Sequence, residues 1–358
     1  MELNQTEQTL IALLRRAWCG ESSLPEGAVD WGKVYQLSLR QGVAAVAFDG
    51  LRQIAIPTAL RYEWMAQTLR CELDYEAKRK AIGQLSQLWS SHGLQGIILK
   101  GMAFAQFYPK PSHRPCGDLD VFFFDDWELA NRAVEETGTV VSRGFYKNSS
   151  FTWQGMLVEN HQFCTPVRGS RRRKQYERFL QQLMREGPLQ PIEGVALLSP
   201  PPLFNLLFFL SHARGHFLFE GGVTLRFVCD WAALLRAYGP QGPYQQSSAF
   251  WDDFLQYCDD YDLLPFACAM SRLAQRVFDV PVPFDCGTDS KADDVLWTDM
   301  MKAGERPVEF FRGWRTRWQL LRRQLASRRK FRCFSRQSML ASLLGQGWAF
   351  VFDRHPSL

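Results

Sequence analysis

The sequence lacks the patterns that mark disulfide scaffolds, zinc modules and membrane spans. Its nine cysteines form no CxxC pair, and neither they nor the six histidines occur at zinc-ligand spacing. An odd, unpatterned set of cysteines is typical of reduced thiols in a cytosol. No basic stretch precedes an apolar run at the N-terminus, and the most apolar stretch, residues 203–210, is too short to cross a bilayer. We therefore expect a cytoplasmic protein with no membrane span.

A large excess of one charge is also absent, because the formal net charge of the 358 residues is +5. The charge is unevenly distributed, however. Residues 312–336 contain ten Lys or Arg and no Asp or Glu, with two Trp and two Phe among them. Such a run can bind an RNA or an acidic partner through phosphate contacts and stacking. An amphipathic last helix with solvated arginines explains the same pattern, and we favour that interpretation.

Apolar periodicity predicts helices at both ends of the chain and strands between them. Residues 1–92 are expected to be helical, with a long helix over 60–91. Residues 93–199 are expected to form a small core with strands at 96–99, 119–124, 139–145, 194–198 and on both sides of Gly155, and a helix at 127–136. Three consecutive prolines at 200–202 open a C-terminal helical region, residues 200–358. The predicted fold class is therefore α+β, with a small mixed sheet between helical domains.

The strongest chemical signal is a strand ending at Lys100 and Gly101, a loop with Arg114, and a second strand that opens with Asp118 and Asp120. Residues two apart on a strand point to the same face, so both aspartates should project together. Adjacent carboxylates repel one another unless a cation lies between them. Magnesium beside substrate phosphates is the usual solution. The same pair is also common in turns, where Asp is favoured.

These residues, in this order, resemble the bacterial nucleotidyltransferase family proteins, a branch of the DNA polymerase beta-like nucleotidyltransferase superfamily. That group has a strand ending in Leu-Lys-Gly, a loop with Tyr-Pro and Arg, and then Gly-Asp-hydrophobic-Asp. Later come an acidic residue two before a His, a His-x-x-x-His helix, and a helix with Arg and Asp one turn apart. The wider superfamily places a Ser after the motif glycine, where this chain has Met102. The matching positions here are Leu99, Lys100, Gly101, Tyr108, Pro109, Arg114, Gly117, Asp118, Leu119, Asp120, Glu159, His161, His212, His216, Arg226 and Asp230.

The resemblance implies a transferase with a nucleotidyltransferase core in residues 93–199. It would move an NMP group from a nucleoside triphosphate such as ATP to an unidentified hydroxyl acceptor and release pyrophosphate. Asp118, Asp120 and Glu159 would be catalytic and would hold Mg²⁺, with Mn²⁺ as the alternative ion. Contacts to the nucleotide and its phosphates would come from Lys100, Gly101, Arg114 and Gly117.

Five further residues are predicted on the acceptor side. His212 and His216 lie four apart, which places them on one helix face, either as a zinc pair without an evident third ligand or as a hydrogen-bonded polar face. Arg226 and Asp230 are most simply an i, i+4 ion pair. The fifth residue, His161, should share a strand face with Glu159.

Two alternatives to the enzyme stay open. The chain can be a catalytically inactive relative that serves as a scaffold, or an RNA-binding protein led by the basic run at 312–336. The acceptor can be a small molecule, a protein side chain or an RNA end, and the sequence does not choose among them.

Overall fold

The computed structural model describes residues 3–20, 22–144, 146–168, 170–220, 222–303, 328–337 and 339. Most of the basic run at 312–336 therefore lies outside the described residues, and so does most of the long last helix expected there. The chain separates into two compact units, each built from discontinuous segments. The described residues of one unit lie within 1–72, 107–115 and 210–339, and those of the other lie within 73–106 and 116–209. The predicted boundaries at 92/93 and 199/200 stay a prediction.

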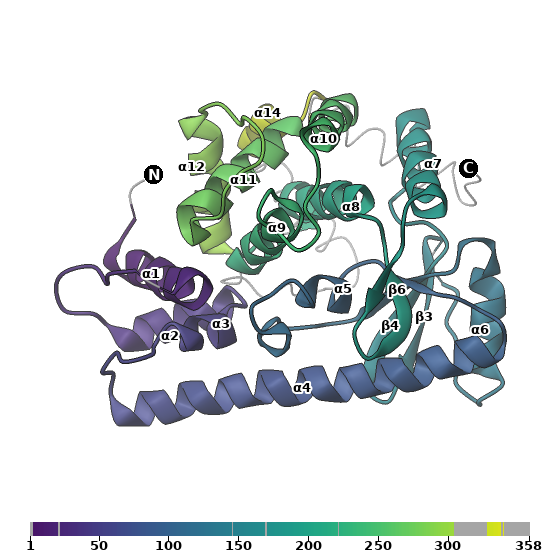
Figure 1. Ribbon diagram of the computed structural model, residues 1–358, viewed down its shortest axis with the longest axis horizontal. Helices are drawn as coiled ribbons and strands as arrows, with labels where there is room; N and C mark the ends of the chain where they lie inside the picture. Colours follow the sequence, from purple (N-terminus) through teal and green to yellow (C-terminus); the bar gives the residue numbers. More distant parts are fainter. Residues whose placement is uncertain are drawn as a thin grey trace, which may run out of the picture. The chain divides into compact units, whose positions relative to one another are not determined.

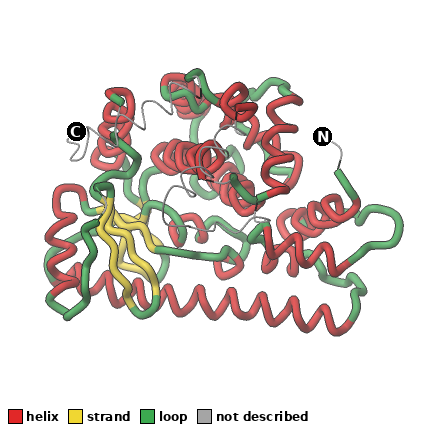
Figure 2. Tube along the Cα trace, turned by 180° about the vertical axis from the view of Figure 1, so that it is seen from behind, coloured by secondary structure: helices red, strands yellow, loops and turns green. Residues whose placement is uncertain are grey.

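The second unit is organised around one six-stranded mixed sheet, drawn in yellow in Figure 2. Its strand order is β3-β4-β2-β1-β6-β5. The central strand β2 runs parallel to β4 and antiparallel to β1, and β3 and β4 form a hairpin. This mixed sheet with helical flanks confirms the predicted α+β class. The strands are β1 (Ile97–Ile98), β2 (Leu119–Phe122), β3 (Asn148–Trp153), β4 (Met156–His161), β5 (Gln190–Ile192) and β6 (Val195–Ser199).

Helices cover one face of this sheet and create its core. The last turns of α4 (Thr58–Ser91) contribute Leu85 and Trp89, and α6 (Trp127–Glu135) contributes alanines and Val134. Leu119 and Val121 of β2 point into the same core, and both are almost wholly buried. Because neighbouring strand residues alternate between faces, the polar residues next to them point the other way. The remaining elements of this unit are α5 (Met102–Ala105), η2 (Phe124–Asp126) and α7 (Arg171–Glu186).

The other unit consists of helices packed around large aromatic side chains. Trp231 of α9 donates its indole N–H to the hydroxyl of Ser271 on α11 at 2.9 Å, which satisfies a buried donor. Two long helices, α4 and α8 (Pro202–Gly215), contribute residues to both units (Figure 1). The elements of this unit are α1 (Gln5–Cys19), α2 (Trp31–Arg40), α3 (Ala44–Asp49), η1 (Pro111–His113), η3 (His216–Glu220), α9 (Leu225–Tyr238), α10 (Ser248–Asp260), α11 (Leu264–Phe278), α12 (Ser290–Lys302) and α14 (Arg328–Phe334).

Local signals explain several helix ends. Asn4 and Glu7 form a capping box at the start of α1, so two backbone N–H groups are satisfied there. Gly93, with φ of 73°, follows α4 and lets the chain turn back, as a helix-ending glycine does. Pro202 is the first residue of α8, where its missing N–H costs nothing. None of the described helices is both long and apolar enough to cross a membrane.

Some expected elements differ from the structure. Residues 139–144 do not form the predicted strand and supply only an isolated bridge between Ser142 and Ser150. Val140 is 86% exposed and Val141 is only partly buried, so little apolar surface holds this segment in a sheet. Conversely, α7, α12 and the short strand β5 were not predicted. The first turn of α7 is purely basic, so the acidic signal of a helix start is missing, although Ser170 occupies the N-cap.

Candidate active site

The acidic residues meet because two parallel strands are in register. Asp120 of β2 lies opposite Glu159 of β4, and Phe122 lies opposite His161. Paired residues on neighbouring strands project to the same face, which is the face opposite the apolar core. Asp118 immediately precedes β2 and shares this face by alternation. The strands thus gather three carboxylates and one imidazole that are far apart in sequence.

Two basic side chains lie between these carboxylates. Lys100 Nζ is 2.8 Å from Asp120 Oδ2 and 3.4 Å from Asp118 Oδ2. His161 Nε2 is 2.9 Å from Asp120 Oδ1 and 3.4 Å from Glu159 Oε2. Asp120 is therefore at the centre of the group, with Lys100 on one side and His161 on the other.

Exposure decreases toward Asp120. The side chains of Asp120 and His161 are each 2% exposed, whereas Lys100 is 21%, Glu159 31% and Asp118 34% exposed. A substrate in solvent can therefore reach Glu159 and Asp118 directly. Asp120 is held in a low-dielectric environment, where charge interactions are strong.

The electrostatics of the group favour the charged forms of Asp120 and Glu159. Burial disfavours the charged form of Asp120, but the hydrogen bond from His161 and the charge of Lys100 outweigh it, and its pKa lies well below the ordinary 3.8. The hydrogen bond with His161 likewise lowers the pKa of Glu159 despite its partial burial. Burial lowers the pKa of Lys100 and of His161, yet the neighbouring carboxylates raise both above their usual values.

The donor atoms fit a divalent cation. One oxygen of Asp120, one of Glu159 and one nitrogen of His161 all lie within 4.8 Å of one another. Carboxylate oxygens and imidazole nitrogens are common ligands for such ions. Among the described residues this is the one group of three or more His, Cys, Asp or Glu side chains with that closeness. The predicted metal triad of Asp118, Asp120 and Glu159 differs from this group, in which His161 takes the third place.

Gly101 has the backbone conformation expected of a motif glycine. Its φ is 66° and its ψ is −108°, a region that side-chain-bearing residues rarely adopt. It begins the short helix α5, directly after Lys100. Gly117 is exposed and precedes Asp118. Contacts from Lys100, Gly101 and Gly117 to a nucleotide stay predictions.

Arg114 is engaged elsewhere, in a buried cluster of the other unit. Its Nε and NH2 groups donate to the two oxygens of Asp230 at 2.7 and 2.9 Å, and the hydroxyl of Tyr108 donates to Oδ1 at 2.6 Å. Arg114 and Asp230 are 3% exposed. The i, i+4 ion pair expected between Arg226 and Asp230 is therefore wrong: Asp230 bonds the distant Arg114, and Arg226 lies over the ring of Phe227. A phosphate contact by Arg114 stays a prediction.

His212 and His216 are adjacent, as their spacing predicts. Their Nε2 atoms are 3.1 Å apart, so one ring must donate a hydrogen and the other accept it. Both rings lie against Phe227. No third ligand for a zinc ion accompanies them among the described residues. Their predicted role on the acceptor side is untested by this arrangement.

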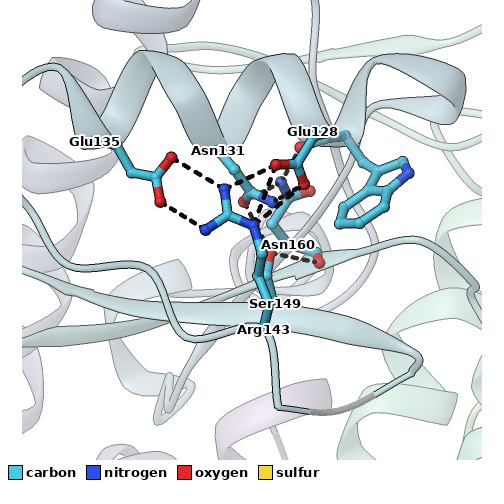
Figure 3. A network of polar contacts seen from close by, with 7 residues as sticks. Glu128, Asn131, Glu135, Arg143, Ser149 and Asn160 are labelled. Carbon is cyan, nitrogen blue, oxygen red and sulfur yellow. Dashed lines mark hydrogen bonds and ion pairs between the residues drawn. The ribbon is translucent and has the colours of Figure 1, made fainter.

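A polar network that the sequence analysis did not anticipate lies on the opposite face of β4 (Figure 3). Asn160, between Glu159 and His161 in sequence, donates to Asn131 of α6 at 2.8 Å and to the carbonyl of Trp127 at 2.7 Å. Asn131 also accepts a hydrogen bond from Ser149 of β3. At the rim of the network, Arg143 pairs with two glutamates of α6, Glu128 and Glu135. The network ties α6 to the two strands of the hairpin and so fixes the strand that carries Glu159 and His161.

Comparison with known proteins adds independent information. Residues 27–279, well over half of the chain, match the family described as uncharacterised nucleotidyltransferase. Neither a curated protein nor a solved structure matches the chain. The matched segment includes both strands of the site, Lys100 and the Arg114–Asp230 cluster. From the extent of this match, the chain belongs to the uncharacterised nucleotidyltransferase family.

Proposed function

We propose that this protein is a metal-dependent nucleotidyltransferase that moves an NMP group from a nucleoside triphosphate to a hydroxyl acceptor and releases pyrophosphate. The observation that supports it best is the meeting of Asp120, Glu159 and His161 within 4.8 Å on one sheet face. Lys100 and the more exposed Asp118 border the same group. Family membership supports nucleotidyl transfer as the class of reaction.

The proposed reaction forms one bond and breaks another at the α-phosphorus. The acceptor oxygen bonds to this phosphorus while the bond to the bridging oxygen of the β-phosphate breaks, so pyrophosphate leaves. The hydroxyl proton passes to a carboxylate, and we assign Glu159 because it is ionised and accessible to solvent. A divalent cation, when bound, supplies charge neutralisation for the phosphates and polarises the reacting oxygens.

The chain's own residues would divide the remaining work. Asp118 and Asp120 would hold the cation and orient the triphosphate. Lys100, whose ammonium group lies on the partly exposed side of Asp120, can turn toward a phosphate oxygen and form a charge-assisted hydrogen bond. The positive φ of Gly101 allows backbone N–H groups to approach a phosphate without a side chain in the way.

Thermal unfolding with each of the four NTPs, with and without Mg²⁺ or Mn²⁺, tests this function. A ligand at about 100 times its dissociation constant adds roughly 2.7 kcal/mol, which moves the midpoint of a chain this size by about a few degrees. We expect a metal-dependent shift for the wild type, accompanied by pyrophosphate release once an acceptor is supplied. The shift should disappear in the Asp118→Asn/Asp120→Asn double variant.

The matched control is Asp125→Asn/Asp126→Asn, which changes the same charge in the last two residues of η2. This control should keep the metal-dependent shift. Nucleotide binding without metal dependence, or equal shifts in both double variants, would count against the enzyme. Salt-sensitive RNA binding that survives loss of Asp118 and Asp120 would instead favour the RNA-binding alternative.

A further inference from the structure

The surroundings of His161 distinguish its two ring nitrogens. Nδ1 lies 3.2 Å from the backbone carbonyl of Phe163, and Nε2 faces Asp120 and Glu159. A carbonyl oxygen can only accept, so Nδ1 carries a hydrogen. The hydrogen on Nε2 is the one donated toward Asp120, so a metal ion that replaces it binds the Nε2 lone pair next to two carboxylate oxygens. A histidine that binds a metal through one nitrogen usually donates the other N–H to a carbonyl or carboxylate in this way.

The carbonyl that orients the ring is itself fixed by a buried glutamate. Glu177 of α7 is fully buried and accepts from the backbone N–H groups of Cys164 and Thr165, at 2.8 and 2.7 Å. It also accepts from the hydroxyl of Thr165 and from the side chain of Gln181, at 2.7 and 2.8 Å. The three bonds from Cys164 and Thr165 hold the turn that follows β4 immediately after Phe163, and the bond from Gln181, also on α7, orients the carboxylate. The helix α7 thus positions the ring of His161 indirectly, through Glu177 and the backbone carbonyl of Phe163.

The two sides of Asp120 also differ in chemistry. On the side of Asp118 the atoms that can ligate a metal are carboxylate oxygens, and the ammonium group of Lys100 lies beside them. On the side of Glu159 the set contains an imidazole nitrogen. Mg²⁺ prefers oxygen ligands, whereas imidazole best suits the later first-row transition metals; Mn²⁺, although mainly an oxygen-binding ion, accepts a nitrogen ligand more readily than Mg²⁺ does.

We propose that His161 is a direct metal ligand, that it makes the site select a first-row transition-metal ion such as Mn²⁺ over Mg²⁺, and that Glu177 is its positioning residue. This inference rests on the proposed function, because it specifies the ion of the same site. It also revises the expectation that the metal site consists of three carboxylates and holds Mg²⁺.

Metal binding by the full chain without nucleotide tests the proposal, with Mn²⁺ and Mg²⁺ titrated by calorimetry. We expect the wild type to bind Mn²⁺ at least about 100-fold more tightly than Mg²⁺. His161→Gln should lose most of this preference, mainly through weaker Mn²⁺ binding. Glu177→Gln should weaken Mn²⁺ binding by about 10- to 100-fold, as loss of an outer-shell partner does, and should therefore reduce the preference for Mn²⁺ over Mg²⁺. His92→Gln, which changes a histidine at the exposed end of α4, is the control and should bind as the wild type does.

A second measurement needs no variant and so stands even where a substitution prevents folding. Electron spin echo modulation of Mn²⁺ bound to the wild type should show coupling to a directly bound ¹⁴N nucleus. Absence of this coupling, or an unchanged Mn²⁺ to Mg²⁺ ratio in His161→Gln, would overturn the role of His161 while leaving a metal-dependent transferase intact. No binding of either ion, with or without nucleotide, would instead remove the proposed function itself.

Discussion

At the scale of single residues, the site combines a buried centre with an accessible edge. Asp120 is 2% exposed between Lys100 and His161, and Glu159 is 31% exposed. A substitution of Asp120 disturbs its ion pairs with both Lys100 and His161, whereas a substitution of Glu159 removes one carboxylate with little effect on packing. Activity and stability can therefore be separated most cleanly at Glu159.

Glu159→Gln is expected to lower kcat of NMP transfer by about 10²- to 10⁴-fold, the usual contribution of a positioned general base. The amide keeps the shape of the side chain, and loss of a partly exposed ion pair changes stability by no more than about 1 kcal/mol. Pyrophosphate release at saturating nucleotide, together with urea unfolding, measures both. Glu136→Gln, at an exposed acid after α6, should leave kcat unchanged. Full activity in Glu159→Gln would exclude it as the base.

The sequence predicted which residues meet in the site where those residues lie close together on one strand. Strand alternation places Asp118 with Asp120, and Glu159 with His161, whatever the rest of the chain does. The partner of Asp230 was not predictable in this way. Arg114 is 116 positions away, and the neighbour at i−4, Arg226, is the pair that helical spacing suggests. Tertiary packing decides whether Arg114 or Arg226 pairs with Asp230, and a single sequence does not show how distant segments pack.

At the scale of elements, the loop of residues 107–115 is attached to α9 by a buried ion pair. Asp230 binds Arg114 through two hydrogen bonds and Tyr108 through a third. A buried pair of this kind contributes little compared with an apolar pair, but losing one partner leaves an uncompensated charge.

Asp230→Ala should therefore destabilise the protein by about 3–5 kcal/mol, because Arg114 stays buried without its carboxylate. Tyr108→Phe removes one hydrogen bond to a charged group and should cost about 1.5–3 kcal/mol. Arg226→Ala removes only a contact over Phe227 and should cost about 1 kcal/mol or less. Chemical denaturation of the three variants provides the comparison. Equal losses of stability in Asp230→Ala and Arg226→Ala would indicate that Arg226 and Asp230 form the i, i+4 ion pair after all.

The helix over 60–91 was predictable because good helix formers run through it with few breakers, and the hairpin because two strand-like stretches flank Gly155. The helix α7 was missed although Tyr176, Leu180 and Met184 form a buried apolar row along it. Its first four residues are basic, so the acidic signal of a helix start is missing there. The buried carboxylate of Glu177 adds a polar anchor that an apolar pattern does not reveal.

At the scale of the whole molecule, a buried imidazolium links three segments of the helical unit. His113 donates from both ring nitrogens, to Asp49 of α3 and to Glu72 of α4, at 2.7 Å each. Lys110 also pairs with Asp49. Burial lowers the pKa of His113, but the two carboxylates outweigh it and raise the pKa above its ordinary 6.5. Because both nitrogens donate, the protonated ring is the form that this arrangement stabilises.

The raised pKa gives stability a defined dependence on pH. The contribution of His113 is fully present below its unfolded value of about 6.5 and is lost as the pH rises through the folded value. Urea unfolding should therefore show the wild type losing stability as the pH rises above about 6.5. Below this pH, His113→Gln should be about 1–3 kcal/mol less stable than the wild type, and its stability should change less as the pH rises. Parallel pH profiles for both proteins would contradict this account.

The alternation of β2 has a consequence for how such a chain can change over time. Leu119 and Val121 are constrained by folding, whereas Asp118 and Asp120 are constrained by chemistry, and the two demands fall on successive positions of one short strand. A descendant that lost catalysis but still served as a scaffold would keep apolar residues at every second position. Its acidic positions would be free to drift. A relative in which the apolar positions of β2 are kept and the acidic positions between them are replaced would thus be identified as an inactive member of this family.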